Sequence, residues 1–415
     1  MAAPRATPPV PRRARRVYQT LRAERRTLQQ AVAALALSTA AGFVAGLILG
    51  SITGTLELLP ELLVLIPASV GMRGMIFGAM GARLGTGIAA GVFEPTLRRG
   101  GMLAENVEVG IISAVLSSFY LAGMAKLVAS AFGADTVSFW DLVTISVVGG
   151  VIASAVILVV TVGLAVQSFR RAWDLDAVST PMVTAIGDMI TLPALFFATF
   201  IARSDSLNAV VAALCAGAAL AALARAALGS SATVRRTLFE MAGVSTLAPL
   251  LDIAAGLVLY AHRNELNATP AILILIPPFV SQAGAIGGIL SSRLSSKLQL
   301  GVITPRGRPE RPALTDATIV VVLGLIVFVS IGGIATVLAS VAGVARPSAG
   351  LMLGGTILAG MLVLPVTLAV GYYVAVLTTR FGLDPDNHGV PTITATLDLT
   401  GVAAVLFVMS ILGVT

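Results

Sequence analysis

The chain is poor in the residue types on which soluble enzymes depend. It has one cysteine and two histidines in 415 residues, and charged residues make up 11% of the composition. The single Cys215 excludes internal disulfides and cysteine-based metal sites. His262 and His388 leave little for zinc or haem, and the same shortage argues against a membrane enzyme. A soluble domain carries roughly a quarter charged residues, so a chain that is 57% hydrophobic is predicted to be an integral membrane protein.

Positive charge is concentrated at the N-terminus. The net charge is +7, and eight arginines before the first apolar run account for the excess, which is therefore no signal of nucleic-acid binding. We expect residues 1–30 to form a basic cytoplasmic arm. The first apolar stretch is a full span without a small-residue cleavage site after it, so we expect no signal peptide. The eight residues are Arg5, Arg12, Arg13, Arg15, Arg16, Arg22, Arg25 and Arg26.

Long apolar runs recur along the chain and predict an all-α polytopic membrane protein with about 11 transmembrane helices. Two of the runs, 59–91 and 269–300, exceed the ~20 residues needed to cross a bilayer and hold prolines and glycines in their middle. We expect these two to be broken or steeply tilted. The runs fall near 31–50, 59–91, 107–132, 141–167, 180–202, 206–228, 238–260, 269–300, 315–343, 349–377 and 390–414.

Basic residues orient the helices, because cytoplasmic loops are enriched in arginine and lysine. With the N-terminus in the cytoplasm, ten arginines fall in inside loops and three in outside loops. We therefore expect a multi-pass protein of the cell (plasma or inner) membrane, with its N-terminus cytoplasmic and its C-terminus outside. The inside residues are Arg98, Arg99, Arg170, Arg171, Arg235, Arg236, Arg306, Arg308, Arg311 and Arg380, and the outside ones are Arg203, Arg263 and Arg346.

The sequence contains an internal duplication. Shifted by 210 residues, segment 60–95 aligns with 270–305 at 14 of 36 identical positions, and 170–197 aligns with 380–407 at nine of 28. Two separate blocks that share one offset without a gap indicate a duplication. The identical pairs include Pro60/Pro270, Pro67/Pro277, Gly74/Gly284, Arg83/Arg293, Pro181/Pro391, Thr184/Thr394 and Asp188/Asp398.

The duplication predicts two five-helix repeats, 31–202 and 231–415, joined by a linker helix at 203–230. Five spans per repeat would invert the second repeat relative to the first, but the extra helix restores a parallel orientation. The pseudo-two-fold axis then runs along the membrane normal, as in transporters built from parallel repeats. The two fifth helices can therefore face each other across this axis at equal depth.

The duplication also pairs two aspartates inside apolar helices. Asp188 lies in "TPMVTAIGDMITLPALFF", about 12 Å from the cytoplasmic end by helical rise, and Asp398 is its twin in "VPTITATLDLTGVAAVLF". Thr184 and Thr394 lie four residues earlier and share a helix face with the aspartates. A carboxylate in hydrocarbon costs several kcal/mol, so such residues usually mark a functional site.

Two carboxylates close together in a low dielectric repel each other unless a proton or a cation lies between them. A divalent cation cancels both charges, and all-oxygen surroundings favour magnesium, calcium or manganese over zinc or copper. Magnesium gives up its water reluctantly, so we expect it to keep several waters between the carboxylates. In the alternative interpretation, each aspartate only hydrogen-bonds across helices or pairs with Arg73 or Lys126.

Other charged residues give weaker signals. Asp252 lies inside a span with Gly42 as its counterpart, and it either hosts a coupling Na⁺ or H⁺ or balances Arg73. Arg73, opposite Ala283, belongs to such a second site, or else it snorkels or pairs with a backbone carbonyl. Four aspartates precede the fifth helices at the cytoplasmic mouth, where they attract cations or cap the helices. They are Asp174, Asp176, Asp384 and Asp386.

The repeated blocks resemble the MgtE-type magnesium transporters and their duplicated eukaryotic solute-carrier relatives. The segments "DPDNHGVPTITATLDLTG" (384–401) and "TPMVTAIGD" (180–188) are similar to that family's fifth-helix motif, and "GARLGT" (81–86) and "SSRLSS" (291–296) to its second-helix ending. The likeness covers most of 31–415. It implies a magnesium pathway on the pseudo-symmetry axis, with Asp188 and Asp398 as ion-binding residues.

The sequence departs from that family in two respects. The family usually has a Gly-Asn pair in the second helix, and Met75 and Ala285 occupy the Asn positions here. The first apolar run already begins near position 31, so we expect no cytoplasmic sensor domain before it and no gating by one. In single-repeat members two chains form the pore, and this chain resembles that dimer fused.

We therefore predict a transporter for a divalent cation, Mg²⁺ first, with Asp188 and Asp398, and less directly Thr184 and Thr394, binding a partly hydrated ion. Na⁺ or H⁺ is the candidate coupling ion. The alternative is a passive channel, and a carrier for another small solute is a weaker one. The expected partners are the cation and membrane lipid, without nucleic acid. A single chain suffices for the pore, and a homo-oligomer stays open.

Overall fold

The computed structural model describes residues 25–59, 61–132, 137–171, 175–299, 301–383 and 388–414, which contain helices and no strand. The first half comprises α2 (Arg25–Ser51), α3 (Thr53–Leu58), α4 (Leu62–Ala89), α5 (Met102–Ala131), α6 (Phe139–Arg171) and α7 (Leu175–Ala202). The linker comprises α8 (Asp205–Ala224) and the π-helical turn η1 (Arg225–Gly229). The second half comprises α9 (Ala232–Ala261), α10 (Arg263–Ala268), α11 (Pro270–Gln299), α12 (Arg311–Val341), α13 (Ala349–Phe381) and α14 (Val390–Ile411).

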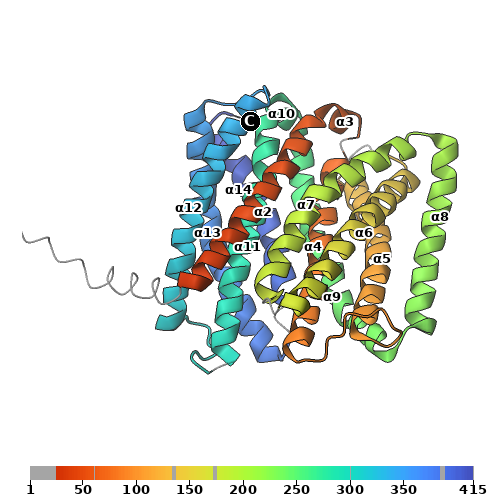
Figure 1. Ribbon diagram of the computed structural model, residues 1–415. Coiled ribbons are helices and arrows are strands. Elements are labelled where there is room, and N and C mark those ends of the chain that lie inside the picture. The colour runs from red at the N-terminus through yellow and green to blue at the C-terminus, as the bar shows by residue number, and fades with distance from the viewer. Residues whose placement is uncertain are drawn as a thin grey trace, which may run out of the picture.

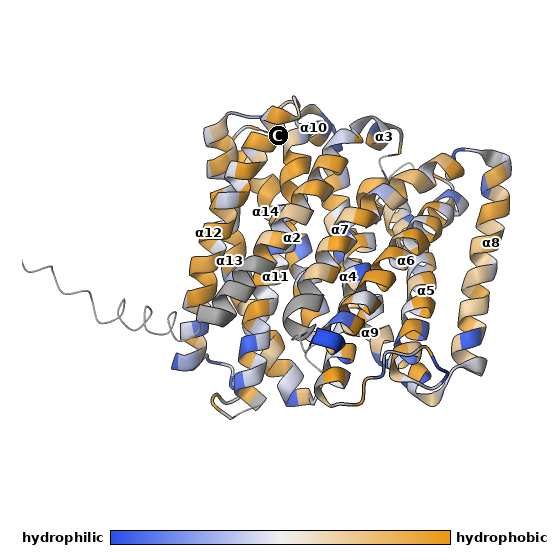
Figure 2. Cartoon of the chain, in the orientation of Figure 1, coloured by the Kyte–Doolittle hydropathy of each residue, from blue (hydrophilic) through white to orange (hydrophobic). Residues whose placement is uncertain are grey.

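These helices form a membrane-spanning bundle. Ten helices of the described chain are long and apolar enough to cross a bilayer, and α2 contains a shorter apolar helix, Leu35–Ser51. Hydrophobic residues cover most of their length, and hydrophilic residues gather mainly near the helix ends (Figure 2). The predicted all-α polytopic fold with about 11 spans is therefore confirmed.

The helix boundaries repeat at the offset found in the sequence. Adding 210 to the bounds of α3, 53–58, gives 263–268, which are the bounds of α10, and adding 210 to 139–171 turns α6 into α13. The short helices α3 and α10 both lie at the upper end of the bundle, on the side of the C-terminus (Figure 1). Equivalent helices thus end on the same side of the bundle, as parallel repeats require.

The two halves interlock through their first helices. α2 packs along α11 of the other half, and α9 packs along α4. Glycines permit both crossings: a Cβ on Gly46 would lie 2.3 Å from the Ile274 carbonyl oxygen, and one on Gly256 would lie 2.5 Å from that of Val64. Small residues let membrane helices approach this closely. The repeat offset carries Gly46 onto Gly256 and Val64 onto Ile274, so the crossing itself is duplicated.

The second helices of the two halves, α4 and α11, form the centre of the bundle. They are the most deeply buried spans, and each contacts helices of both halves. Pro67 lies inside α4, and Pro277 and Pro278 lie inside α11, yet both helices run on without a break. These two helices were expected to be either broken or steeply tilted, and among the described residues the expectation of a break is wrong. At 28 and 30 residues, they measure about 42 and 45 Å and must tilt to fit a core of about 30 Å.

The linker helix α8 stands at the edge of the bundle (Figure 1). A polar network attaches it to α6: Asn208 donates to Asp141 at 2.5 Å, and Thr144 donates to Asn208 at 2.5 Å. Much of its remaining surface is exposed and apolar, including Leu214 and Leu220, which suits contact with lipid.

Candidate ion-binding site

Asp188 is buried in the middle of α7, where 6% of its surface is exposed. Its hydrogen-bonding neighbour is Ser281 of α11, whose hydroxyl oxygen lies 3.2 Å from that of Ser38 on α2. Thr191, three residues further along the same face of α7, has a buried hydroxyl with no partner among the described residues. The first aspartate thus lies among neutral oxygen groups from three helices.

Asp398 of α14 has a second carboxylate beside it. Asp252 of α9 lies within hydrogen-bonding reach of Asp398 and is 1% exposed. Both oxygens of Asp252 lack a donor among the described residues, and two carboxyl groups this close need a shared proton or a cation between them. Gly71 of α4 makes room for this group, because a Cβ there would lie 2.5 Å from Asp252 Oδ2.

Asp188 and Asp398 lie close enough for their charges to act on each other. Their helices, α7 and α14, both contact α4, and α14 also packs on α11. Three carboxylates therefore gather around the central helices. Within the described ranges, no three acidic, histidine or cysteine side chains converge tightly enough to ligate a metal ion directly.

The two threonines of the predicted site occupy equivalent places. Thr184 Oγ1 lies 3.9 Å from the position of a Cβ on Gly74, and Thr394 packs against Gly284 with its methyl group at 3.2 Å from such a Cβ. Thr394 donates to the carbonyl oxygens of Val390 and Pro391 in its own helix, at 3.1 Å each. The structure thus places both threonines against the central helices.

Arg73 lies inside the bundle on α4, 2% exposed. It donates to the backbone carbonyl of Ser69, and its Nη2 donates to Ser118 Oγ at 3.0 Å. A Cβ on Gly150 of α6 would lie 2.2 Å from that nitrogen. Among the described residues no ion pair joins Arg73 to Asp252. The contacts of Arg73 therefore match the expected pairing with a backbone carbonyl and do not include a direct contact with Asp252.

The four aspartates predicted at the cytoplasmic mouth are not placed by the structure. Asp174, Asp384 and Asp386 lie outside the described residues. Asp176 belongs to α7, but its side chain is not described either.

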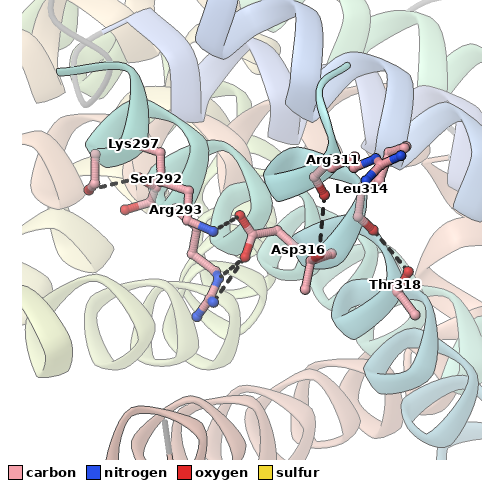
Figure 3. Close-up of polar contacts among 9 residues, drawn as sticks. Ser292, Arg293, Lys297, Arg311, Leu314, Asp316 and Thr318 are labelled. Carbon is pink, nitrogen blue, oxygen red and sulfur yellow. Dashed lines mark hydrogen bonds and ion pairs between the residues drawn. The ribbon is translucent and has the colours of Figure 1, made fainter. Parts of the chain in front are cut away.

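A polar cluster that the sequence did not predict lies near the opposite end of the bundle from the C-terminus. Asp316 of α12 accepts from Arg293 at 3.0 Å and from Lys297 at 2.6 Å (Figure 3). In the first half the same place holds Arg83 and Asn106, joined at 2.8 Å, beside a cavity of about 430 Å³. The repeated arginines, Arg83 and Arg293, were the signal in the sequence for such a cluster, but their partners Asn106 and Asp316 differ in charge.

Comparisons with known proteins agree with this architecture. The profile of the MgtE family, described as "Divalent cation transporter", matches residues 66–198 and 276–408, two ranges related by the repeat offset. The chain is 23% identical over 365 residues to solute carrier family 41 member 3 of Rattus norvegicus, which covers 82% of this chain and 77% of the relative. It is 24% identical over 258 residues to solute carrier family 41 member 2 of Mus musculus, and this match covers 61% of this chain and 44% of the relative. No solved structure matches the chain.

Proposed function

The chain belongs to the MgtE family of divalent cation transporters, and from this premise we propose that it moves Mg²⁺ through a site formed by Asp188 and Asp398. The observation that carries the proposal is the placing of these duplicated carboxylates inside the bundle, within electrostatic range of each other. A divalent cation between them cancels both charges. Because no three acidic groups in the described chain converge to ligate a metal directly, the ion keeps much of its water.

Serine and threonine hydroxyls complete this proposal. Ser281 lies within hydrogen-bonding reach of Asp188. The buried hydroxyl of Thr191, on the same helix as Asp188, has no hydrogen-bond partner among the described residues. Such groups hydrogen-bond to the water shell of the ion, with Thr184 and Thr394 acting from one turn away. Two fused repeats supply both aspartates, so a single chain forms the pore, with the N-terminus in the cytoplasm and the C-terminus outside.

The proposed transport mode is coupled exchange with Na⁺ or H⁺. What supports it is Asp252, a third buried carboxylate that lies beside Asp398 without a donor among the described side chains. A monovalent cation or a proton can occupy this pair when Mg²⁺ is absent. The second candidate is a passive channel, in which Asp252 only adds to the attraction for cations.

Flux measurements on purified protein in liposomes test the proposal. A Mg²⁺-sensitive dye inside the vesicles reports uptake, with and without an opposing Na⁺ or pH gradient. A coupled carrier takes up Mg²⁺ against its own gradient when the second gradient is imposed, whereas a channel follows the Mg²⁺ gradient and the membrane potential alone. The double variant Asp188→Asn/Asp398→Asn is expected to show no uptake, and Asp141→Asn, at the α8 contact, is the control with normal uptake.

A further inference from the structure

Four charged side chains among those that the structure describes lie deep in the helices of the bundle. Arg73, Asp188 and Asp252 are buried, and Asp398 is partly buried beside Asp252. By helical rise they lie about 14 to 21 Å from the helix ends on the side of the C-terminus, so all four share one level of the membrane.

Within the described ranges, none of these four charges has a counter-charge in contact with it. Arg73 donates to a backbone carbonyl and a serine hydroxyl, and Asp188 has Ser281 as its neighbour. Asp252 and Asp398 have each other, which are like charges. Among the described residues no ion pair includes any of the four. Charges in such an interior are poorly screened, so each acts on the others without touching them.

The duplication separates these charges into two sets. Asp188 and Asp398 are equivalent positions, and together they carry a charge of −2 when both are ionised. Asp252 and Arg73 have no charged counterpart, since Gly42 and Ala283 stand at the equivalent positions of the other repeat. In their ionised forms, Arg73 and Asp252 carry opposite charges that cancel. The interior therefore keeps the charge of the duplicated pair, which one divalent cation neutralises.

The second half shows which side chains fill the equivalent space when no arginine lies there. Ser69 and Ser118, the partners of Arg73, correspond to Phe279 and Phe328, whose rings lie 4.7 Å apart. Phe328 packs over Gly360 as Arg73 packs over Gly150. An apolar aromatic pair thus fills the equivalent space, and packing alone does not call for an arginine.

We propose that Arg73 is a specificity-determining residue, which offsets Asp252 and holds the ion-binding interior at a net charge of −2, matched to one divalent cation. This inference rests on the proposed role of Asp188 and Asp398. It assigns Arg73 a long-range electrostatic role without contact with the ion. A single monovalent cation leaves the interior at −1 and a trivalent cation leaves it at +1, so either neutralises the interior less completely than one divalent cation does.

The test is a charge-compensation series on the full-length protein, with Mg²⁺ binding measured by titration calorimetry. Asp252→Asn leaves the interior at −1 instead of −2 and is expected to weaken binding by about tenfold or more. Adding Arg73→Met restores −2, and the double variant is expected to bind within about threefold of wild type. The matched control adds Arg83→Met to Asp252→Asn, because Arg83 lies on the same helix beside the cavity, and no rescue is expected there.

A second measurement avoids any change at Asp252. Arg73→Met alone leaves the interior at −3, so the affinity for La³⁺ relative to Mg²⁺ is expected to rise by about tenfold, while Arg73→Lys leaves the ratio unchanged. An unchanged ratio in Arg73→Met, or a double variant that binds no better than Asp252→Asn, overturns the inference. Mg²⁺ binding that survives in Asp188→Asn/Asp398→Asn overturns the proposed function instead, so the two failures are distinguishable.

Discussion

The carboxyl group of Asp252 on α9 lies within hydrogen-bonding reach of Asp398 on α14. On the other side of the pseudo-symmetry axis, the neighbour of Asp188 is the hydroxyl of Ser281. The two halves of the bundle therefore surround equivalent aspartates with different chemistry. A duplicated pair became an asymmetric site with a third carboxylate on one side.

The close contact between Gly71 and Asp252 predicts a glycine that is needed for the site and not for the fold. In Gly71→Ala the new Cβ would lie 2.5 Å from Asp252 Oδ2, and the short side chain must move away from Asp398. We expect Mg²⁺ affinity to fall by about threefold to tenfold, with little change in thermal stability. Gly78→Ala on the same helix, where nothing lies within 4 Å, is the control. Equal affinities in the two variants would contradict this reading of the contact.

The duplicated helix crossing predicts a loss of stability instead. A Cβ on Gly256 would meet the carbonyl oxygen of Val64, which is backbone and cannot move aside. We expect Gly256→Ala to lower the free energy of unfolding in mixed micelles by about 1–3 kcal/mol or more, and Gly46→Ala to do the same at the equivalent crossing. In Gly243→Ala, on α9 with open space around it, helix propensity favours alanine by about 1 kcal/mol. If the crossing variants were as stable as this control, the interlocked arrangement of the halves would be wrong.

The buried carboxylate of Asp316 predicts a structural role away from the ion. Its oxygens accept from Arg293 and Lys297, and the side chain is fully buried (Figure 3). We expect Asp316→Asn to lower the free energy of unfolding by about 2–4 kcal/mol. This is at or below the cost of about 3–5 kcal/mol for breaking a buried ion pair, because the side chains of Arg293 and Lys297 are partly exposed and can turn to water. Mg²⁺ affinity is expected to stay within about twofold of wild type.

The control for this variant is Glu240→Gln, which breaks the exposed pair with Arg236 and is expected to cost less than about 1 kcal/mol. A similar cost in both variants would show that the Asp316 cluster contributes no more than a surface ion pair.

The sequence predicted the architecture well because the two repeats still share identical residues at many equivalent positions. Apolar runs indicated about 11 spans, and the repeat offset recurs in the bounds of α3 and α10. Parallel repeats followed from counting spans. The effect of prolines was not predictable in the same way: around Pro67 and Pro277 the sequence left a break or a steep tilt open, and α4 and α11 continue through them. Packing from neighbouring helices decides such cases.

The neighbours of the aspartates could not be read from the sequence, because they depend on which faces the helices present. Gly71 and Arg73 are two residues apart on α4, so they point about 200° apart around the helix. Gly71 therefore meets Asp252 of α9, while Arg73 meets Ser118 of α5. The sequence left a pairing of Arg73 with Asp252 open. The crossing of α9 over α4, fixed by Gly256, is what separates them.

The central claim is that Asp188 and Asp398 together bind the transported ion. The most direct test measures Mg²⁺ binding to the purified protein by calorimetry, in wild type, in Asp188→Asn, in Asp398→Asn and in the double variant. We expect each single variant to lose about tenfold or more in affinity and the double variant to show no measurable binding, with all four folded as judged by thermal unfolding. Wild-type affinity in a folded double variant would contradict the account.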